Sequence, residues 1–411
     1  MRILLINHYA GSPEMGMEFR PYYFAKQWVN AGHHVFILAA NNSHLRKKKI
    51  KINKSFEKQD IDGIKYIWVK TPEYNGNGVS RVLNIFSFVF KSFLNAKKLA
   101  KEIKPDIVIG SSTYPIDNYT ARRIAKLSGA KHIYEVHDLW PLSPMELGKM
   151  SKYHPFILIM QHGENFAYKH CDAVISMLPN TKEHMQNHGL DFKKWHYVPN
   201  GINPEEWENP SDIPDTHKNI LENLKNENKT IIGYAGGHAI SNALDTLIEA
   251  AEILNENKKI HFVLVGDGVE KNRLMKKASK LSNFIFLDPI PKNSIPRLLD
   301  KMDILVLGTQ KSNLYKYGIS MNKLMDYMMA GKPIIQYISG YNFIEIAAAG
   351  LCCESENPQQ LADCIFKLSE APIEERRQYG ENAKKFVLQN HDNKILSQKC
   401  LDIFKELTTS S

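Results

Sequence analysis

The chain has 411 residues, 43% of them hydrophobic and 24% charged, which is enough for two globular domains of ordinary size. No run of 18 apolar residues occurs, and the apolar opening Arg2–Ile6 is too short for a secretory signal. We therefore expect neither a membrane span nor export. The five cysteines lack CxxC spacing, which favours a reducing cytoplasm and argues against a zinc site.

The net charge of +9 is concentrated in the first half. Residues 1–205 hold 28 Lys and Arg against 17 Asp and Glu, whereas the remainder holds 25 against 27. A basic half predicts an anionic partner, such as a nucleic acid, a membrane surface or a phosphorylated substrate. No interleaved aromatic stripe or known recognition motif supports the first of these, so we expect no nucleic-acid partner.

The first half alternates apolar strand segments with amphipathic helices. We predict strands at 2–8, 34–39, 64–69, 106–111, 132–136, 173–177 and 195–198. We predict helices at 19–31, 83–103, 115–128, 155–170 and 180–188, and the basic segment 46–58 is interpreted as a loop. Strands that alternate with helices indicate a parallel, doubly wound sheet.

The polar segment 203–228 contains three prolines and is predicted to be a linker, after which the pattern restarts. The second half has predicted strands at 230–234, 261–265, 284–287, 303–308 and 333–337, and predicted helices at 243–255, 269–281, 295–301 and 322–329. The tail from Pro358 is predicted to be helical. The expected fold class is thus α/β, with two Rossmann-like domains facing across a cleft. The expected domains are 1–203 and 204–385, and a helix at 386–411 is expected to pack back on the first.

Glycines gather at three points where a predicted strand ends and a helix begins. Gly11 and Gly16 follow the first strand, Gly236 and Gly237 follow the strand at 230–234, and Val265–Gly268 follows the next one. Glycine backbones at a helix start can approach an anion closely. Each segment alone is also compatible with an ordinary tight turn.

A histidine stands at the carboxyl end of the strand at 132–136. Because ligands of α/β sheets bind at that edge, His137 is a candidate to hydrogen-bond a hydroxyl or to stabilise developing charge. A single histidine can equally be structural.

The segment Gly318–Pro333 combines a loop with a short helix. Ser320 is placed to cap this helix. Lys323 at a helix N-terminus favours phosphate, whereas Asp326, one turn further on, suits a ribose diol. One loop and helix would thus hold both parts of a nucleotide diphosphate.

Two basic or apolar segments could face a membrane. The apolar stretch Val82–Phe93 is flanked by Arg81, Lys97, Lys98 and Lys101, and it is either a buried crossover helix or an amphipathic membrane-facing helix. The run Arg46-Lys47-Lys48-Lys49 is either a solvated loop or a contact to anionic lipid headgroups.

Taken in chain order, these motifs resemble the retaining glycosyltransferases of family 4, which have the GT-B fold, and in particular the bacterial branch that builds O-antigen and capsule repeats. The resemblance also includes Asn200-Gly201-Ile202 before the linker and Asn322–Pro333. It implies transfer of an N-acetylated or deoxy sugar from a UDP-sugar to a polyprenyl-diphosphate-linked or other saccharide acceptor. It further implies no metal and no cofactor beyond the UDP-sugar co-substrate, and a cytoplasmic enzyme peripheral to the inner face of the membrane.

The resemblance also implies roles for single residues. Catalysis would fall to His137 and Lys323. The acceptor would be bound by Gly11, Glu18 and Arg20. The donor would be bound by Gly16, Gly236, Gly237, His238, Gly266, Gly268, Ile290, Ser320, Asn322, Lys323 and Asp326.

Two departures from the family pattern are visible. Asp326 matches the second acid of the family's E-x7-E motif, but Gly318 stands where the first acid would be. The basic pair that usually follows the double glycine is replaced by a region with His238 and Asn242. Lys323 then becomes the candidate to neutralise the diphosphate.

Two further function classes stay open. A UDP-N-acetylglucosamine 2-epimerase shares the two-domain fold, but it would need acid and base carboxylates around the sugar, and the acid at Gly318 is missing. A two-lobed solute-binding protein would need a secretory signal, which the sequence lacks.

Overall fold

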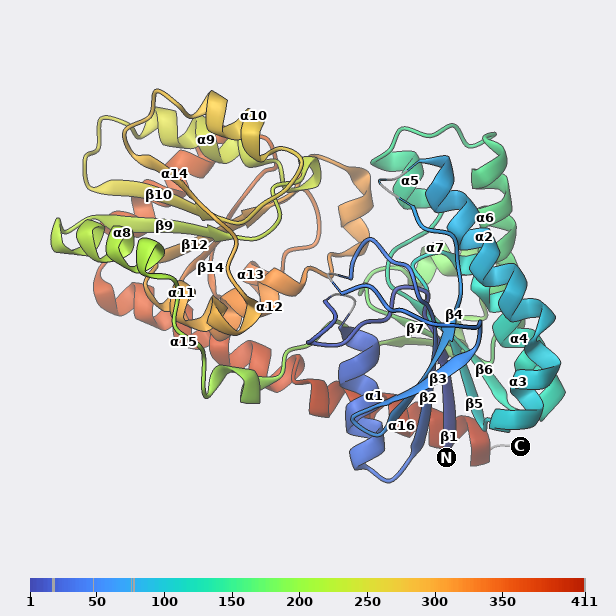
Figure 1. Cartoon of the computed structure of the whole chain (residues 1–411). Helices are drawn as coiled ribbons and strands as arrows, with labels where there is room; N and C mark the ends of the chain where they lie inside the picture. Colours follow the sequence, from blue (N-terminus) through green and yellow to red (C-terminus); the bar gives the residue numbers. More distant parts are fainter. Residues whose placement is uncertain (17–18, 47, 75, 77, 410–411) are drawn as a thin grey trace. The chain divides into compact units, whose positions relative to one another are not determined.

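The computed structural model describes residues 1–409 apart from 17–18, 47, 75 and 77. The chain divides into two compact units, one formed by Met1–Asn200 together with the helix that begins at Asn393, and one formed by Gly201–Asp392. Each unit is a largely parallel sheet covered by helices (Figure 1). The predicted fold class of two Rossmann-like α/β domains is therefore confirmed.

The first unit contains an eight-stranded sheet with the strand order β3-β4-β2-β1-β5-β6-β7-β8. Its strands are β1 (Arg2–Ile6), β2 (His34–Ala40), β3 (Glu57–Ile61), β4 (Ile64–Val69), β5 (Ile107–Gly110), β6 (Lys131–Val136), β7 (Ala173–Ser176) and β8 (Trp195–Tyr197). The pairs are parallel except that β3 runs antiparallel to β4 at the edge. The strand order reverses direction between β1 and β5, which is where such sheets bind ligands.

The helices of the first unit cover both faces of this sheet. They are α1 (Arg20–Asn30), α2 (Val79–Leu94), α3 (Ala96–Ile103), α4 (Asn118–Ser128), α5 (Leu142–Glu146), α6 (Pro155–His170), α7 (Lys182–Asn187) and α16 (Asn393–Thr409), with short 3-10 turns η1 (Pro115–Asp117) and η2 (Phe192–Lys194).

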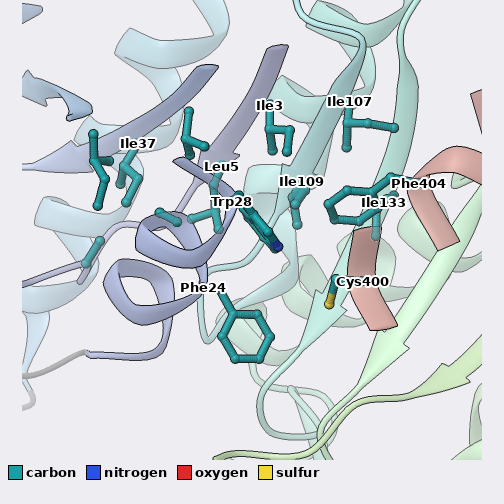
Figure 2. Packing of buried hydrophobic residues seen from close by; sticks show 14 of the residues in the cluster. Ile3, Leu5, Phe24, Trp28, Ile37, Ile107, Ile109, Ile133, Cys400 and Phe404 are labelled. Carbon is teal, nitrogen blue, oxygen red and sulfur yellow. The ribbon is translucent and has the colours of Figure 1, made fainter. Parts of the chain in front are cut away.

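The C-terminal helix α16 belongs to the core of the first unit. Figure 2 shows Cys400 and Phe404 of α16 beside Trp28 of α1 and the isoleucines of the central strands. The rings of Trp28 and Phe404 are 5.3 Å apart, and Trp28 Nε1 donates a hydrogen bond of 3.0 Å to the carbonyl of Ser397. Buried aromatic surface thus anchors the end of the chain on the first sheet.

The second unit contains a six-stranded parallel sheet with the order β11-β10-β9-β12-β13-β14. Its strands are β9 (Thr230–Ala235), β10 (Ile260–Val265), β11 (Phe284–Leu287), β12 (Ile304–Gly308), β13 (Ile334–Tyr337) and β14 (Gly350–Cys353). This is the doubly wound order of nucleotide-binding sheets, and its topological switch point lies between β9 and β12.

Helices and short 3-10 turns connect these six strands. The helices are α8 (Asp215–Asn226), α9 (Leu244–Ile253), α10 (Lys271–Lys277), α11 (Ile295–Asp300), α12 (Asn322–Met329), α13 (Phe343–Ile346), α14 (Pro358–Glu370) and α15 (Ile373–Asn390). The 3-10 turns are η3 (Pro204–Trp207), η4 (Ile240–Asn242), η5 (Lys292–Ser294) and η6 (Asn313–Tyr317).

Three predictions about the elements are wrong. The predicted linker 203–228 contains the helix α8, which buries His217, Leu221 and Leu224. The sequence did not reveal this helix because two buried leucines are too few for a clear helical pattern. The predicted helix 83–103 is divided into α2 and α3 at Asn95. The edge strand β3 lies in and beyond the predicted basic loop, and its polar sequence shows no alternation.

Candidate active site

Most of the predicted site residues lie in loops at the carboxyl ends of the strands of their own sheet. In the second unit, the loops after β9, β10 and β12 carry Gly236–His238, Gly266–Gly268 and the approach to α12. In the first unit, the loop after β1 carries Gly11 and Gly16, and His137 follows β6.

The two glycine loops of the second unit lie directly against each other. A Cβ atom on Gly266 would stand 2.0 Å from the carbonyl oxygen of Gly236, and Gly266 has a φ of +150°, so no larger residue fits there. The backbone N–H of His238 donates to the carbonyl of Asp267 at 2.8 Å, and the N–H of Gly268 donates to Asp267 Oδ1 at 2.8 Å. The structure therefore brings the predicted glycines of both loops together.

Lys323 on α12 reaches back to the first of these loops. Its Nζ donates to the hydroxyl of Tyr234 at 2.9 Å and to Asn242 Oδ1 at 2.7 Å, and it lies 4.8 Å from the centre of the Tyr234 ring. A Cβ atom on Gly236 would stand 3.3 Å from Lys323 Nζ. Burial lowers the pKa of Lys323 to about 7. A half-buried ammonium group thus sits beside the double glycine.

Asn242 orients both the lysine and the loop. Its Oδ1 accepts from Lys323, and its Nδ2 donates to the carbonyl of Gly237 at 2.8 Å, where the Tyr234 hydroxyl also donates at 2.7 Å. The amide can make both hydrogen bonds in only one orientation. Tyr234 and Asn242 are site residues that the predicted set missed, although both stand within six residues of the double glycine.

His238 lies buried behind the double glycine, between the rings of Tyr234 and Phe286. Burial, with the charges of Lys271 and Lys323, lowers the pKa of His238 to about 4. The imidazole is therefore neutral near pH 7. Such a ring can shape the loop or offer a neutral hydrogen bond, but it adds no positive charge to the site.

Asp326 lies one turn along α12 and is half-buried. Burial raises its pKa to about 6, although Lys292 opposes this shift and Glu206 adds to it. Lys292 and Glu206 form an ion pair with each other at 3.2 Å. The charges that act on Asp326 thus come from η3 and η5, whereas Lys323 hydrogen-bonds Tyr234 and Asn242 around the β9 loop.

The start of α12 differs from the prediction. The helix begins at Asn322 with Met321 in the N-cap position, and no side chain caps it, so the predicted Ser320 cap is wrong. Ser320 stands one residue too early for that role. Asn322 is exposed on the first turn, and Ile290 is half-buried in the loop after β11.

Gly318 has a backbone that explains the missing acid. Its φ is +113° and its ψ is 179°, a region populated almost only by glycine. It ends η6, and its N–H donates to the carbonyl of Tyr315 at 3.1 Å. A glutamate at this position would be strained, so this loop has a different course from one that presents an acid here.

In the first unit, His137 joins a buried hydrogen-bond network. Its Nε2 lies 3.0 Å from Ser111 Oγ and 3.3 Å from Glu135 Oε2, and Ser111 Oγ donates to Glu135 Oε2 at 2.6 Å. Because the serine proton goes to the carboxylate, His137 Nε2 is the donor to both oxygens. The ring is thereby fixed in orientation at the end of β6.

Arg20, predicted to bind the acceptor, is instead the counter-ion of this network. Its guanidinium pairs with Glu135 at 3.0 Å and donates to the carbonyls of Val198 and Pro199. Burial alone would raise the pKa of Glu135, but the Arg20 charge and the His137 hydrogen bond outweigh it, so that pKa is well below its usual range. Removing either partner of a buried pair costs about 3–5 kcal/mol. Because its donors already serve the protein, we assign Arg20 a structural role.

The loop after β1 is tightly folded. The Gly11 carbonyl accepts from the Tyr66 hydroxyl at 2.7 Å, and the Gly16 N–H donates to the Ser12 carbonyl at 3.0 Å. Gly16 also forms a bridge with Arg46. The backbones of both glycines therefore stabilise the fold of the loop. The third predicted acceptor contact, Glu18, lies outside the described residues.

The basic run 46–49 was predicted to be a solvated or lipid-facing loop, and for Arg46 this prediction is wrong. Arg46 is buried, its guanidinium lies 5.1 Å from the Trp68 ring, and it donates to the carbonyls of His8, Ala40 and Asn41. Its neighbours Lys48 and Lys49 are exposed. Arg46 thus connects the carboxyl ends of β1 and β2 through its hydrogen bonds. The composition of the basic run does not indicate this structural role.

Two family models match the chain. The model described as Glycosyltransferase Family 4 matches residues 15–206, and the model described as Glycosyl transferases group 1 matches residues 215–386. The chain belongs to the GT-B glycosyltransferases of family 4. This glycosyltransferase is 25% identical to Escherichia coli K12 WcaI, which is named as a glycosyl transferase of colanic acid biosynthesis, over 390 residues that cover 90% of this chain and 93% of WcaI.

Solved structures share the fold of this glycosyltransferase. Sucrose-phosphate synthase from Thermosynechococcus elongatus has a TM-score of 0.74 at 14% identity, covering 100% of this chain and 99% of that one. HepE from Anabaena, solved in complex with UDP and glucose, has a TM-score of 0.67 at 15% identity, covering 98% and 99%. These likenesses agree with the two doubly wound sheets described above.

Proposed function

We propose that this glycosyltransferase moves an N-acetylated or deoxy sugar from a UDP-sugar to a lipid-linked saccharide in the synthesis of a cell-surface polysaccharide, with retention of the anomeric configuration. The observation that carries the nucleotide-sugar part is Lys323, whose ammonium group is held against Gly236 at the switch point of the second sheet. The name of WcaI, with its reference to colanic acid, supports the polysaccharide part.

The diphosphate would lie between Lys323 and the glycine loops. The Lys323 charge and the loop backbone would stabilise the negative charge that grows on the departing UDP. Asp326 would accept hydrogen bonds from the ribose hydroxyls. HepE, which binds UDP and glucose on the same fold, supports this assignment of the nucleotide.

His137 would contact the donor sugar. The Ser111 and Glu135 side chains hold its ring in one orientation, so that it can meet the sugar without reorganising. The acceptor hydroxyl would attack the sugar from the face that the diphosphate leaves, which retains the configuration.

A thermal-shift panel tests the nucleotide and the class of donor together. A ligand that binds only the folded protein raises the melting temperature, so UDP and UDP-sugars are expected to raise it, whereas GDP and NAD are not. A shift with GDP alone would contradict the proposal. Incubation with UDP-N-acetylglucosamine and no acceptor separates the rival class, because formation of its 2-epimer would identify an epimerase.

The surface of α2 supports a membrane-bound acceptor. The exposed fractions of Val79, Leu83, Phe90 and Leu94 are 76%, 59%, 63% and 59%. At 3.6 residues per turn these four side chains fall within an arc of about 60°. The other face of α2 is buried through Ile85 and Phe88, so α2 is a crossover helix that also presents an apolar stripe.

Basic residues accompany this stripe. Lys97, Lys98 and Lys101 are exposed on α3, directly after α2. An exposed apolar stripe followed in the chain by exposed lysines fits a surface of anionic lipid. Over the described part of the chain, no helix has the length and apolar character that a crossing of the bilayer would require. We therefore propose peripheral attachment to the inner face of the membrane through α2.

Replacing both Leu83 and Phe90 with serine is expected to weaken binding to phosphatidylglycerol vesicles by at least about tenfold, because apolar side chains lose their burial in the lipid. Co-sedimentation measures the bound fraction. The matched control is Phe366→Ser, which removes an exposed aromatic side chain from the second unit and should change nothing. Equal sedimentation of the double variant and the unchanged protein would contradict the proposed attachment.

A further inference from the structure

The helices α6 and α7 of the first unit bring together three metal-ligating side chains to which the proposed transfer assigns no role. A carboxylate oxygen of Glu164 and a ring nitrogen from each of His184 and His188 all lie within 4.8 Å of one another. Among the residues that the structure describes, these three have His, Cys, Asp or Glu ligand atoms close enough together to bind one metal ion. The two histidines are four residues apart, so they stand on one face of α7 and its C-terminal turn.

The orientation of His188 suits a metal ligand. Its Nδ1 lies 2.8 Å from the backbone carbonyl of His184, and a carbonyl can only accept, so Nδ1 carries the proton. The other ring nitrogen, Nε2, then has the unshared electron pair that binds metal. Metal-binding histidines in proteins commonly donate their second N–H to a carbonyl in this way.

Glu164 is held in place by its neighbours. Its residue is 1% exposed, Gln161 Nε2 donates to its Oε2 at 2.7 Å, and the Tyr168 hydroxyl donates to its Oε1 at 3.1 Å. Such hydrogen bonds orient the carboxylates of metal sites.

The spacing of the nearest pair fits tetrahedral coordination. His184 Nε2 lies 3.3 Å from Glu164 Oε1. Two ligand atoms that are each about 2.1 Å from a tetrahedral ion are about 3.4 Å apart. The rings of His184 and His188 are 4.3 Å apart between centres, and the ligand atoms of all three residues lie within 4.8 Å of one another.

We propose that Glu164, His184 and His188 bind one divalent transition-metal ion of the zinc class, which ties α6 to α7. Two imidazole nitrogens and one carboxylate oxygen suit zinc, nickel or copper, whereas magnesium and calcium prefer oxygen alone. When the ion binds, the proton that His184 Nε2 shares with Glu164 Oε1 moves by exchange with solvent to His184 Nδ1, so Nε2 offers its electron pair as a neutral imidazole. Water fills the fourth position.

This site goes beyond the proposed function and plays no part in the transfer. The ion bridges residues that are 20 positions apart, so it closes a loop that includes β7 and stabilises the folded first unit. The spacing of the cysteines, which argued against zinc, does not bear on a site made of histidine and carboxylate.

Calorimetric titration of the chelator-treated protein with zinc chloride tests the site. We expect one zinc ion per chain, a higher melting temperature with zinc, and no comparable effect of magnesium. His188→Gln is the informative variant, because it leaves the pair of His184 and Glu164 intact. It should weaken zinc binding by about 10- to 100-fold. His170→Gln removes another half-buried histidine from the same region and should bind zinc as the unchanged protein does.

Three results would overturn the proposal. They are the absence of a stoichiometric zinc site in the unchanged protein, equal zinc affinity in His188→Gln, and equal losses in His188→Gln and His170→Gln. Substitution with cobalt gives a second measurement, since tetrahedral cobalt absorbs visible light strongly. That absorption should be present in the unchanged protein and in His170→Gln, and absent in His188→Gln.

Discussion

Replacing Lys323 with methionine is expected to lower the affinity for UDP by about 10- to 100-fold, because a charged hydrogen bond contributes about 1.5–3 kcal/mol. Methionine has a side chain of similar length, but it removes the charge beside Gly236 and the hydrogen bonds that Lys323 Nζ donates to Tyr234 and Asn242. Isothermal titration with UDP measures the change directly.

The pH dependence of binding separates a phosphate contact from a packing effect. Because burial lowers the pKa of Lys323 to about 7, the free protein loses the ammonium charge as the pH rises above that value. The second phosphate ionisation of the ligand, with a pKa of about 6, is already complete there. Binding must then restore the proton, so the affinity is expected to fall by up to about tenfold per pH unit. The Lys323→Met variant should show no such slope.

Lys332→Met is the matched control for this experiment. Lys332 stands in the same segment of the chain and is partly buried, but its Nζ donates to the carbonyl of Asp300. Its replacement should leave the affinity for UDP and the pH slope unchanged. An unchanged affinity in Lys323→Met would remove Lys323 from the donor site.

Replacing His137 with glutamine should lower the turnover by about 100-fold or more, with less than about a threefold change in the affinity for UDP. The proposed contact is to the sugar, so its loss weakens the stabilisation of the transition state but leaves the affinity for the nucleotide nearly unchanged. The rate is measured as UDP released from the UDP-sugar that gives the largest thermal shift, with a membrane lipid extract as the acceptor source.

His132→Gln controls for the loss of a buried histidine from the same strand. The His132 side chain is fully buried, and its Nε2 lies 3.0 Å from Asn118 Oδ1. This variant is expected to melt at a lower temperature but to keep its turnover per folded molecule. If His137→Gln lost UDP affinity and turnover in parallel, the contact with the sugar would be wrong.

The architecture was predictable from the sequence because it depends on local patterns. Buried parallel strands such as β1, β5 and β12 are almost entirely apolar runs, and they alternate with helices whose apolar positions recur every three or four residues. The glycines and Lys323 were also identifiable, since they stand where a strand ends and a helix begins. Elements without such a pattern were missed, such as the helix α8 and the edge strand β3, as were the short elements α5, α13 and β14.

The roles of charged side chains were less predictable. The family resemblance implied that Arg20 binds the acceptor, and the basic run containing Arg46 was interpreted as a solvated or lipid-facing loop. Both arginines are instead buried and donate to protein groups. Their partners lie on strands distant in the sequence. Glu135 stands 115 positions from Arg20, so no local window contains both.

By itself, the sequence determined the two doubly wound sheets and the strand ends that carry the candidate site, because apolar periodicity and glycine placement are properties of neighbouring residues. Only the tertiary structure decided which charges face each other. It separated the partners of Lys323 from those of Asp326, and it paired Arg20 with Glu135. It also brought Glu164 to His184. These contacts join distant segments, and their strength depends on burial, which a linear sequence does not record.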